Sequence, residues 1–251
     1  MAEASADSRW HFVIQADERG IPAQDYGYVL KDAIEWSAWR YGAPRYDFTL
    51  ASRWPDDGVA DGDRIVPVGS LEWVEFWMTR CCARTLPRPI YIPDALRTPS
   101  YLHRDMRLVA GPLPRQQQPV FVKEATRYKT MDPQVTDRTD QLPAGEYWLA
   151  DVVDFQTEWR AFVHRGELVG LQNYSGDFTR MPDVPTVRRM IGAYTDAPSA
   201  YTLDVGVLDT GSTAVVEVHP FVNCGLYGFE DVVRLPSMLI GGWLFLLAAA
   251  S

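Results

Sequence analysis

Charged side chains interrupt strand-like runs that are otherwise apolar in the second half of this chain. Asp204 lies in YTLDVGV, Glu217 in AVVEVHP and Arg160 in EWRAFV. A charge inside so apolar a run is costly unless it is paired or holds a ligand. Because side chains alternate between the two faces of a strand, Glu217 and His219 point to the same face. The pattern predicts a sheet that gathers charged groups at one place.

The composition is that of a globular protein with a sizeable core. The chain has 251 residues, of which 47% are hydrophobic and 23% are charged, which excludes a disordered chain. The net charge is −9, so the surface as a whole does not attract nucleic acid. We therefore expect no nucleic-acid partner.

The cysteines and the two ends of the chain bear on its location. Cys81, Cys82 and Cys224 have no metal-binding spacing, and their odd number favours free thiols in a reducing compartment. Residues 1–10 are polar and acidic, unlike a secretory signal. The apolar run 238–250 is shorter than the roughly 20 residues that span a bilayer. We expect a cytoplasmic protein whose apolar C-terminal run packs on the core, with a membrane-associated tail as the alternative.

The first part of the chain predicts alternating strands and helices. Residues 10–16 and 64–68 form short apolar runs typical of buried strands. Residues 25–39 repeat apolar side chains every three or four positions, which predicts a helix. Ser70 is placed to cap a second helix that continues to about Cys82. Two successive strand and helix units indicate a small α/β layer.

A proline-rich connector follows. Residues 87–119 contain seven prolines and little periodicity, apart from one short helix expected near residues 100–106. Such a segment is typical of a boundary between domains. We therefore expect a first domain over residues 1–115 and a second over residues 116–251.

The second part is dense in predicted strands. Short apolar runs are bounded by turn residues, and Arg165-Gly166 predicts the turn of a hairpin. The expected strands cover residues 120–123, 146–155, 158–164, 167–174, 200–208 and 214–219, and the expected helices cover residues 185–194 and 230–250.

Basic side chains accompany the carboxylates in this part. Lys123 ends the strand VFVK, and Lys129 follows in a polar loop. Two carboxylates on neighbouring strands suit Mg²⁺, which prefers carboxylate and phosphate oxygens, while lysine and arginine hold phosphates. The sequence contains neither a G-x-x-x-x-G-K-[ST] loop nor a G-x-S-x-G elbow. The set indicates phosphoryl transfer, which depends on positioning and charge neutralisation.

The order of these motifs resembles the ATP-grasp superfamily, in particular its small bacterial and phage proteins. The motifs are VFVK, YWLADVVDF, EWRAFV, LDVGV and VEVHPFVNCGLYG, and VPVGSLEWVEF resembles the N-terminal region of those proteins. The resemblance spans residues 64–230. It implies an α/β fold in two lobes, in which a small N-terminal α/β lobe precedes a nucleotide-clamping lobe of mostly antiparallel strands.

Position by position, the resemblance implies a site for ATP. Lys123 and Lys129 would contact the phosphates, and Glu158 and Arg160 would belong to the same nucleotide site. Arg160 and Lys129 would be the catalytic groups, with Arg160 neutralising the transferred phosphoryl group. The backbone would hydrogen-bond adenine around Trp148, Leu149, Ala150, Asp151 and Val152.

The resemblance also implies a magnesium site at Asp204, Glu217 and His219. The wider superfamily usually has asparagine where this chain has His219. Neutral imidazole is a softer ligand than an amide oxygen and suits magnesium poorly. Either His219 does not bind the metal or the metal site is altered.

The implied activity is an ATP- and Mg²⁺-dependent ligase that activates a carboxylate as an acyl phosphate and joins it to an amine. Its substrates would be small molecules or peptides. A kinase-like phosphotransferase and a non-catalytic nucleotide-binding or protein-interaction module remain alternatives. At single residues, Glu158 and Arg160 could form a surface ion pair, Asp204 could pair with an arginine, and His219 could be a core histidine.

Overall fold

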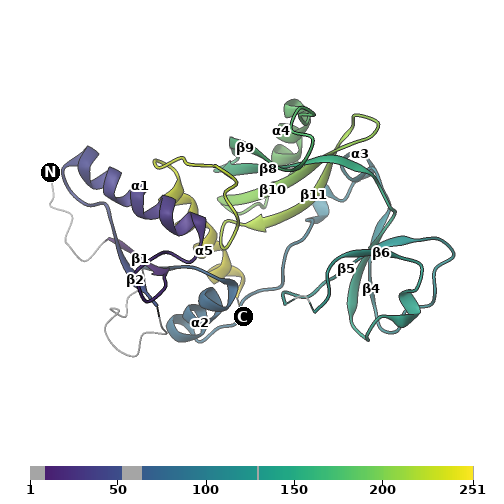
Figure 1. Cartoon of the computed structure of the whole chain (residues 1–251), viewed down its shortest axis with the longest axis horizontal. Coiled ribbons are helices and arrows are strands. Elements are labelled where there is room, and N and C mark those ends of the chain that lie inside the picture. Colours follow the sequence, from purple (N-terminus) through teal and green to yellow (C-terminus); the bar gives the residue numbers. More distant parts are fainter. Residues whose placement is uncertain (1–8, 53–63, 129, 251) are drawn as a thin grey trace.

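Three β-sheets organise the described part of the chain (Figure 1). The computed structural model describes residues 9–52, 64–128 and 130–250. Lys129, a predicted site residue, therefore lies outside the described residues. One sheet is parallel and lies in the N-terminal lobe, and two antiparallel sheets follow it.

The N-terminal lobe is a small parallel sheet with helices, as the sequence predicted. Its strand order is β2-β1-β3, with β1 pairing in parallel with both neighbours. The Ser70 hydroxyl accepts a hydrogen bond from the Trp73 amide at 3.3 Å, which confirms the predicted helix cap. The elements are β1 (Trp10–Gln15), α1 (Asp25–Tyr41), β2 (Tyr46–Ala51), β3 (Ile65–Val68) and α2 (Leu71–Cys82).

The second sheet is a four-stranded antiparallel sheet in the order β11-β10-β8-β9. The predicted hairpin is present, and Arg165 and Gly166 both take positive φ in its turn, as a tight two-residue turn requires. Helix α4 packs its buried residues Val187, Met190 and Ile191 into a core shared with this sheet. The elements are β8 (Phe155–His164), β9 (Glu167–Gly176), α4 (Val184–Ala193), β10 (Ala200–Leu208) and β11 (Thr213–Pro220).

The third sheet is also antiparallel, in the order β4-β7-β5-β6. Its first strand lies inside the segment predicted as a connector, where the predicted short helix is also present as α3 (Pro99–Leu102). The domain boundary near residue 115 stays a prediction, although β4 before it pairs with β7 after it. The strands are β4 (Met106–Ala110), β5 (Val120–Glu124), β6 (Gln134–Thr136) and β7 (Glu146–Ala150), and short 3₁₀ helices cover Asp94–Leu96 and Thr139–Gln141.

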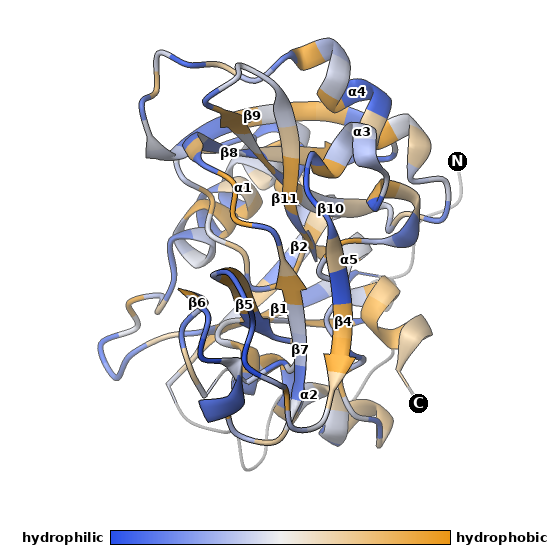
Figure 2. Cartoon of the chain, turned by 90° about the vertical axis from the view of Figure 1, so that its right-hand side faces the viewer, coloured by the Kyte–Doolittle hydropathy of each residue, from blue (hydrophilic) through white to orange (hydrophobic). Residues whose placement is uncertain are grey.

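The apolar C-terminal run forms helix α5 (Leu235–Ala249), which Figure 2 shows as mostly hydrophobic. Met238, Leu239 and Trp243 are buried in one cluster with side chains of β1, α1 and α2, so the helix packs on the core as expected. It begins five residues later than predicted because Pro236 occupies its first turn, where a missing N–H costs nothing. Within the described residues, no helix is both long and apolar enough to cross a membrane.

Candidate active site

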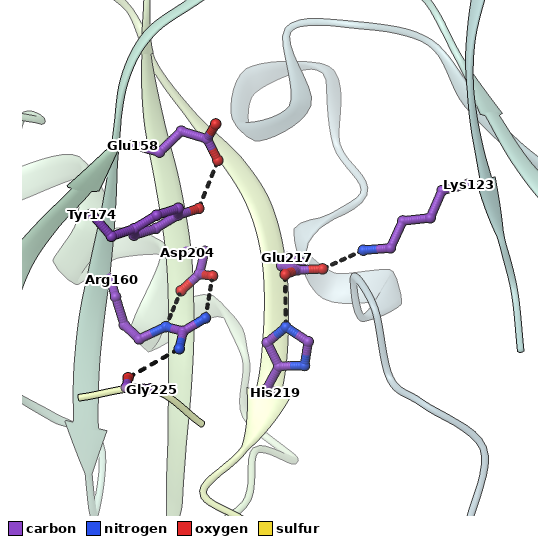
Figure 3. A network of polar contacts seen from close by, with 8 residues as sticks. All are labelled: Lys123, Glu158, Arg160, Tyr174, Asp204, Glu217, His219 and Gly225. Carbon is purple, nitrogen blue, oxygen red and sulfur yellow. Dashed lines mark hydrogen bonds and ion pairs between the residues drawn. The ribbon is translucent and has the colours of Figure 1, made fainter. Parts of the chain in front are cut away.

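The charged residues singled out in the sequence meet across three neighbouring strands (Figure 3). In the sheet register, Asp204 on β10 lies opposite Glu217 on β11 and opposite Arg160 on β8. Lys123 reaches the group from β5 of the other antiparallel sheet. The predicted proximity of the two carboxylates is therefore confirmed.

Arg160 and Asp204 form a buried bidentate ion pair. Arg160 Nε and Nη2 donate to the two carboxylate oxygens of Asp204 at 2.8 and 2.7 Å, and the side chains are 8% and 1% exposed. Burial disfavours the charged guanidinium, but its hydrogen bonds with Asp204 outweigh this effect and raise the pKa of Arg160. Arg160 thus pairs with Asp204 rather than with Glu158, which was the alternative considered from the sequence.

Glu217 is held by two basic side chains. Its Oε2 accepts a hydrogen bond from the Lys123 ammonium, and its Oε1 lies 2.8 Å from His219 Nε2. Burial acts to raise the pKa of Glu217, but the hydrogen bonds and charges of His219 and Lys123 prevail and hold this pKa well below its usual value. The Lys123 ammonium also lies 3.9 Å from the centre of the Tyr91 ring. Glu217 is therefore a carboxylate already arranged to face positive charge.

Two tyrosines that the sequence did not single out complete the surroundings of Arg160. Tyr174 and Tyr227 stack with ring centres 5.1 Å apart, and the Arg160 guanidinium lies 5.8 and 5.0 Å from their centres. The Tyr174 hydroxyl donates to Glu158 at 2.6 Å. Burial, followed by the charges of Asp204 and Glu158, raises the pKa of Tyr174, so its hydroxyl stays protonated.

The loop after β11 closes this side of the site. The carbonyl of Gly225 accepts from Arg160 Nη1 at 3.1 Å. The first turn of α1 holds the same loop, because Asp25 accepts from the Leu226 amide at 3.0 Å and the Tyr26 hydroxyl donates to Asn223 at 3.0 Å. The GLYG motif was the sequence signal for this loop, but its backbone contact with Arg160 could not be derived from it.

The predicted adenine-binding residues lie at the end of β7. Trp148, Leu149 and Ala150 are buried in the strand, where they pair with both β4 and β5. Asp151 and Val152 are exposed just beyond it, and the backbone of Asp151 already bonds to Asp105. Their role in binding adenine stays a prediction.

A cavity of about 370 Å³ opens between β5 and β11. Its polar lining includes Lys123, Glu217, His219 and Asn223, and its floor includes Trp148. This volume is at the small end of the range of about 300–1,000 Å³ typical of small-molecule sites. The predicted phosphate and metal residues therefore border an open space rather than a closed core.

The carboxylates fit a hard divalent cation better than His219 does. Ligand atoms of Asp204, Glu217 and His219 all lie within 4.8 Å of one another. A carboxylate has about four lone-pair sites, so Asp204 can accept a cation while it holds Arg160. Glu217 already faces positive charge, whereas His219 is hydrogen-bonded to Glu217 itself. This arrangement suits an oxygen-liganded ion such as Mg²⁺ at the two carboxylates.

Solved structures share this fold. D-cycloserine synthetase DcsG superposes with a TM-score of 0.58 at 14% identity, over 91% of this chain and 98% of its own. D-alanine–D-alanine ligase from Bacillus anthracis gives 0.56 at 11%, over 96% and 98%. The ATP-grasp ligase PsnB, in complex with a minimal precursor, gives 0.55 at 12%, over 93% and 99%.

The sequence comparison names the family. No curated protein matches this chain. A family described as an ATP-grasp domain, the second family of its clade, matches residues 101–233, which is more than half of the chain. The match covers all the described charged residues of the site, and the expected ATP-grasp fold is confirmed. This chain belongs to that family of ATP-grasp domains.

Proposed function

We propose that the protein is an ATP- and Mg²⁺-dependent ligase that joins a carboxylate to an amine through an acyl phosphate. The observation that carries the proposal is the meeting of Lys123, Asp204 and Glu217 at one open cavity, inside the domain that defines the family. Two antiparallel sheets supply these groups, so a nucleotide between the sheets would contact both. The family and the fold support an ATP-dependent ligase, and the free cysteines fit a cytoplasmic protein.

The proposed reaction has two steps. A carboxylate oxygen of the substrate attacks the γ-phosphorus of ATP, the bond from that phosphorus to the β,γ-bridging oxygen breaks, and ADP leaves. The amine nitrogen then attacks the acyl carbon, phosphate leaves, and the amine loses a proton. Neither step needs a nucleophile from the protein, so positioning and neutralisation of charge are its main contributions.

Each charged residue has a place in this scheme. Lys123 exchanges Glu217 for phosphate oxygens when the nucleotide binds. Arg160 holds Asp204 in position, and within the described part of the chain its contacts use three of its five N–H groups. The other two can neutralise the transferred phosphoryl group. Lys129 stays a predicted phosphate contact.

The two carboxylates, Asp204 and Glu217, would hold Mg²⁺, which supplies charge neutralisation at the phosphates when bound. We assign His219 to orienting Glu217 through the 2.8 Å contact between Nε2 and Oε1. This assignment accounts for an imidazole where the wider superfamily usually has an amide. His219→Asn should therefore retain ATP-dependent activity, whereas Glu217→Gln should lose it.

Trapping with hydroxylamine tests the acyl phosphate. Hydroxylamine converts an acyl phosphate into a stable hydroxamate, so incubation with ATP, Mg²⁺ and a panel of carboxylates should give hydroxamate and stoichiometric phosphate. Glu217→Gln should abolish the product, while Glu230→Gln makes the same change at an exposed carboxylate outside the cavity and should not. A phosphorylated hydroxyl product would identify a kinase-like transferase, and ATP binding without any product would identify a non-catalytic module.

A further inference from the structure

The site cavity has a second, apolar end that the proposed chemistry does not use. Its walls come from the start of α2, the segment after α2, the loop after β11 and the last turns of α5. The apolar lining residues at this end are Leu71, Leu86, Val222, Phe245, Leu246 and Ala249.

This apolar wall is continuous with the hydrophobic core. Leu86 and Leu246 are buried members of the core cluster, and Leu71, Val222 and Phe245 pack against it. A hydrogen bond of 2.7 Å from Arg84 Nη1 to the carbonyl of Leu247 ties the end of α5 to the segment after α2. The wall is thus built from packed side chains on elements that are joined to each other.

The two ends of the cavity differ in origin. The family match covers residues 101–233, which include Lys123, Glu217 and His219 at the polar end. Helix α2 and the segment after it precede the match, and α5 follows it. The apolar end is therefore made mainly by parts of the chain that do not belong to the shared domain, which is where substrate selection is expected to differ among relatives.

We infer that the apolar end binds an aliphatic side chain of the carboxylate substrate. The inference rests on the proposed function, in which the carboxyl group lies at the polar end near Lys123. A substrate whose carboxyl group sits there would extend its side chain along the same cavity toward α5. A charged side chain in that position would lose its hydration without gaining a partner, so the site should select apolar-sided carboxylates, such as hydrophobic amino acids or peptides that end in one.

Binding of two simple carboxylates tests this inference without requiring turnover. Hexanoate carries an apolar tail, and glutarate carries a second carboxylate at similar length. Saturation-transfer NMR titrations with wild-type protein should give a Kd for hexanoate at least about tenfold below that for glutarate, as expected for discrimination by a hydrophobic pocket. Equal affinity for the two, or no transfer to hexanoate, would overturn the inference.

Neighbouring alanines at the end of α5 provide a matched pair of variants. Ala249 and Ala248 are both exposed, but only Ala249 lines the cavity. Ala249→Phe and Ala249→Asp should each weaken hexanoate binding about tenfold, whereas Ala248→Phe and Ala248→Asp should leave it unchanged. Thermal melting of all four variants checks that they are folded. Equal effects at the two positions would contradict the assigned pocket.

Hydroxamate formation from the same carboxylates separates this inference from the proposed function. If hexanoate binds with the stated selectivity but no carboxylate yields hydroxamate, the pocket is supported and the ligase is contradicted. If glutarate yields hydroxamate as efficiently as hexanoate, and Ala249→Phe leaves both unchanged, the ligase is supported and the apolar pocket is contradicted.

Discussion

At the scale of single residues, Arg160 and Asp204 depend on each other. Both are almost fully buried, and the two hydrogen bonds between them satisfy charges that water would otherwise solvate. Removing one partner of such a pair leaves an uncompensated buried charge, which is costlier than removing both. The pair therefore matters to the stability of the protein as well as to the site.

Asp204→Ala should lower the free energy of unfolding by roughly 3–5 kcal/mol. The double variant Arg160→Met/Asp204→Leu should lose clearly less, because no buried charge is left alone. Urea denaturation of the wild type and both variants measures the difference. A single variant within about 1 kcal/mol of the wild type would contradict the structural role given to the pair.

The sequence located these charged residues but could not supply all of their partners. Period-two alternation and the apolar context were enough to place Asp204, Glu217 and Arg160 together. Tyr174 was missed because the hairpin between β8 and β9 contains two irregularities in its register. A regular hairpin continuing from the pairing of His164 with Glu167 would place Glu158 opposite Asn173, but it lies opposite Ser175. Such bulges depend on packing and leave no clear sequence signal.

At the scale of elements, helix α5 shows how closely the two halves of the chain pack. A Cβ atom on Gly242 would lie 2.2 Å from the carbonyl oxygen of Phe221. Backbone cannot yield as easily as the end of a flexible side chain, so only glycine fits there. By contrast, Gly192 in α4 is exposed and has nothing within 4 Å of its ideal Cβ position.

These two glycines give opposite predictions for the same substitution. Gly242→Ala should destabilise the protein by about 1–3 kcal/mol, because the added methyl group forces α5 away from the loop after β11. Gly192→Ala should stabilise it by about 0.4–1 kcal/mol, because it reduces the freedom of the unfolded chain without a clash. Chemical denaturation distinguishes them, and a neutral or stabilising Gly242→Ala would show that the packing of α5 is looser than described.

The elements best predicted from the sequence were those with a strong period or a clear cap. Helices α1 and α2 and strands β10 and β11 belong to this group. Strand β2 was not predicted, because it is an edge strand whose alternate residues Asp47 and Thr49 are exposed. Strand β4 was hidden among prolines, and its pairing with β7 joins segments far apart in sequence. Long-range pairing of this kind is a tertiary property that local patterns do not encode.

At the scale of the whole molecule, the loop after β5 connects the small antiparallel sheet to the N-terminal lobe. Glu75 on α2 accepts a hydrogen bond from the Tyr128 hydroxyl and lies 3.5 Å from Arg127 Nη1. Arg127 also donates to the carbonyl of Pro87. Glu75 thus holds the loop that leads away from Lys123 against the first lobe.

Glu75→Ala should speed hydrogen exchange in residues 124–128 while it changes the melting temperature little. The contacts are near the surface, and such pairs contribute only about 0–1 kcal/mol, yet they restrain this loop locally. Exchange followed by mass spectrometry measures the effect. Glu72→Ala, at an exposed carboxylate on the same helix, is the control, and equal exchange in the two variants would contradict the role of Glu75.

The central claim is that Lys123, Asp204 and Glu217 form the site of a magnesium–nucleotide complex. The most direct measurement is the melting temperature as ATP is increased at fixed Mg²⁺, for the wild type and for Glu217→Gln. A ligand at about 100 times its Kd stabilises the native state by about 2.7 kcal/mol, so the wild type should show a rising melting temperature and Glu217→Gln should show little change. An unchanged melting temperature in the wild type, or an equal rise in both proteins, would contradict the claim.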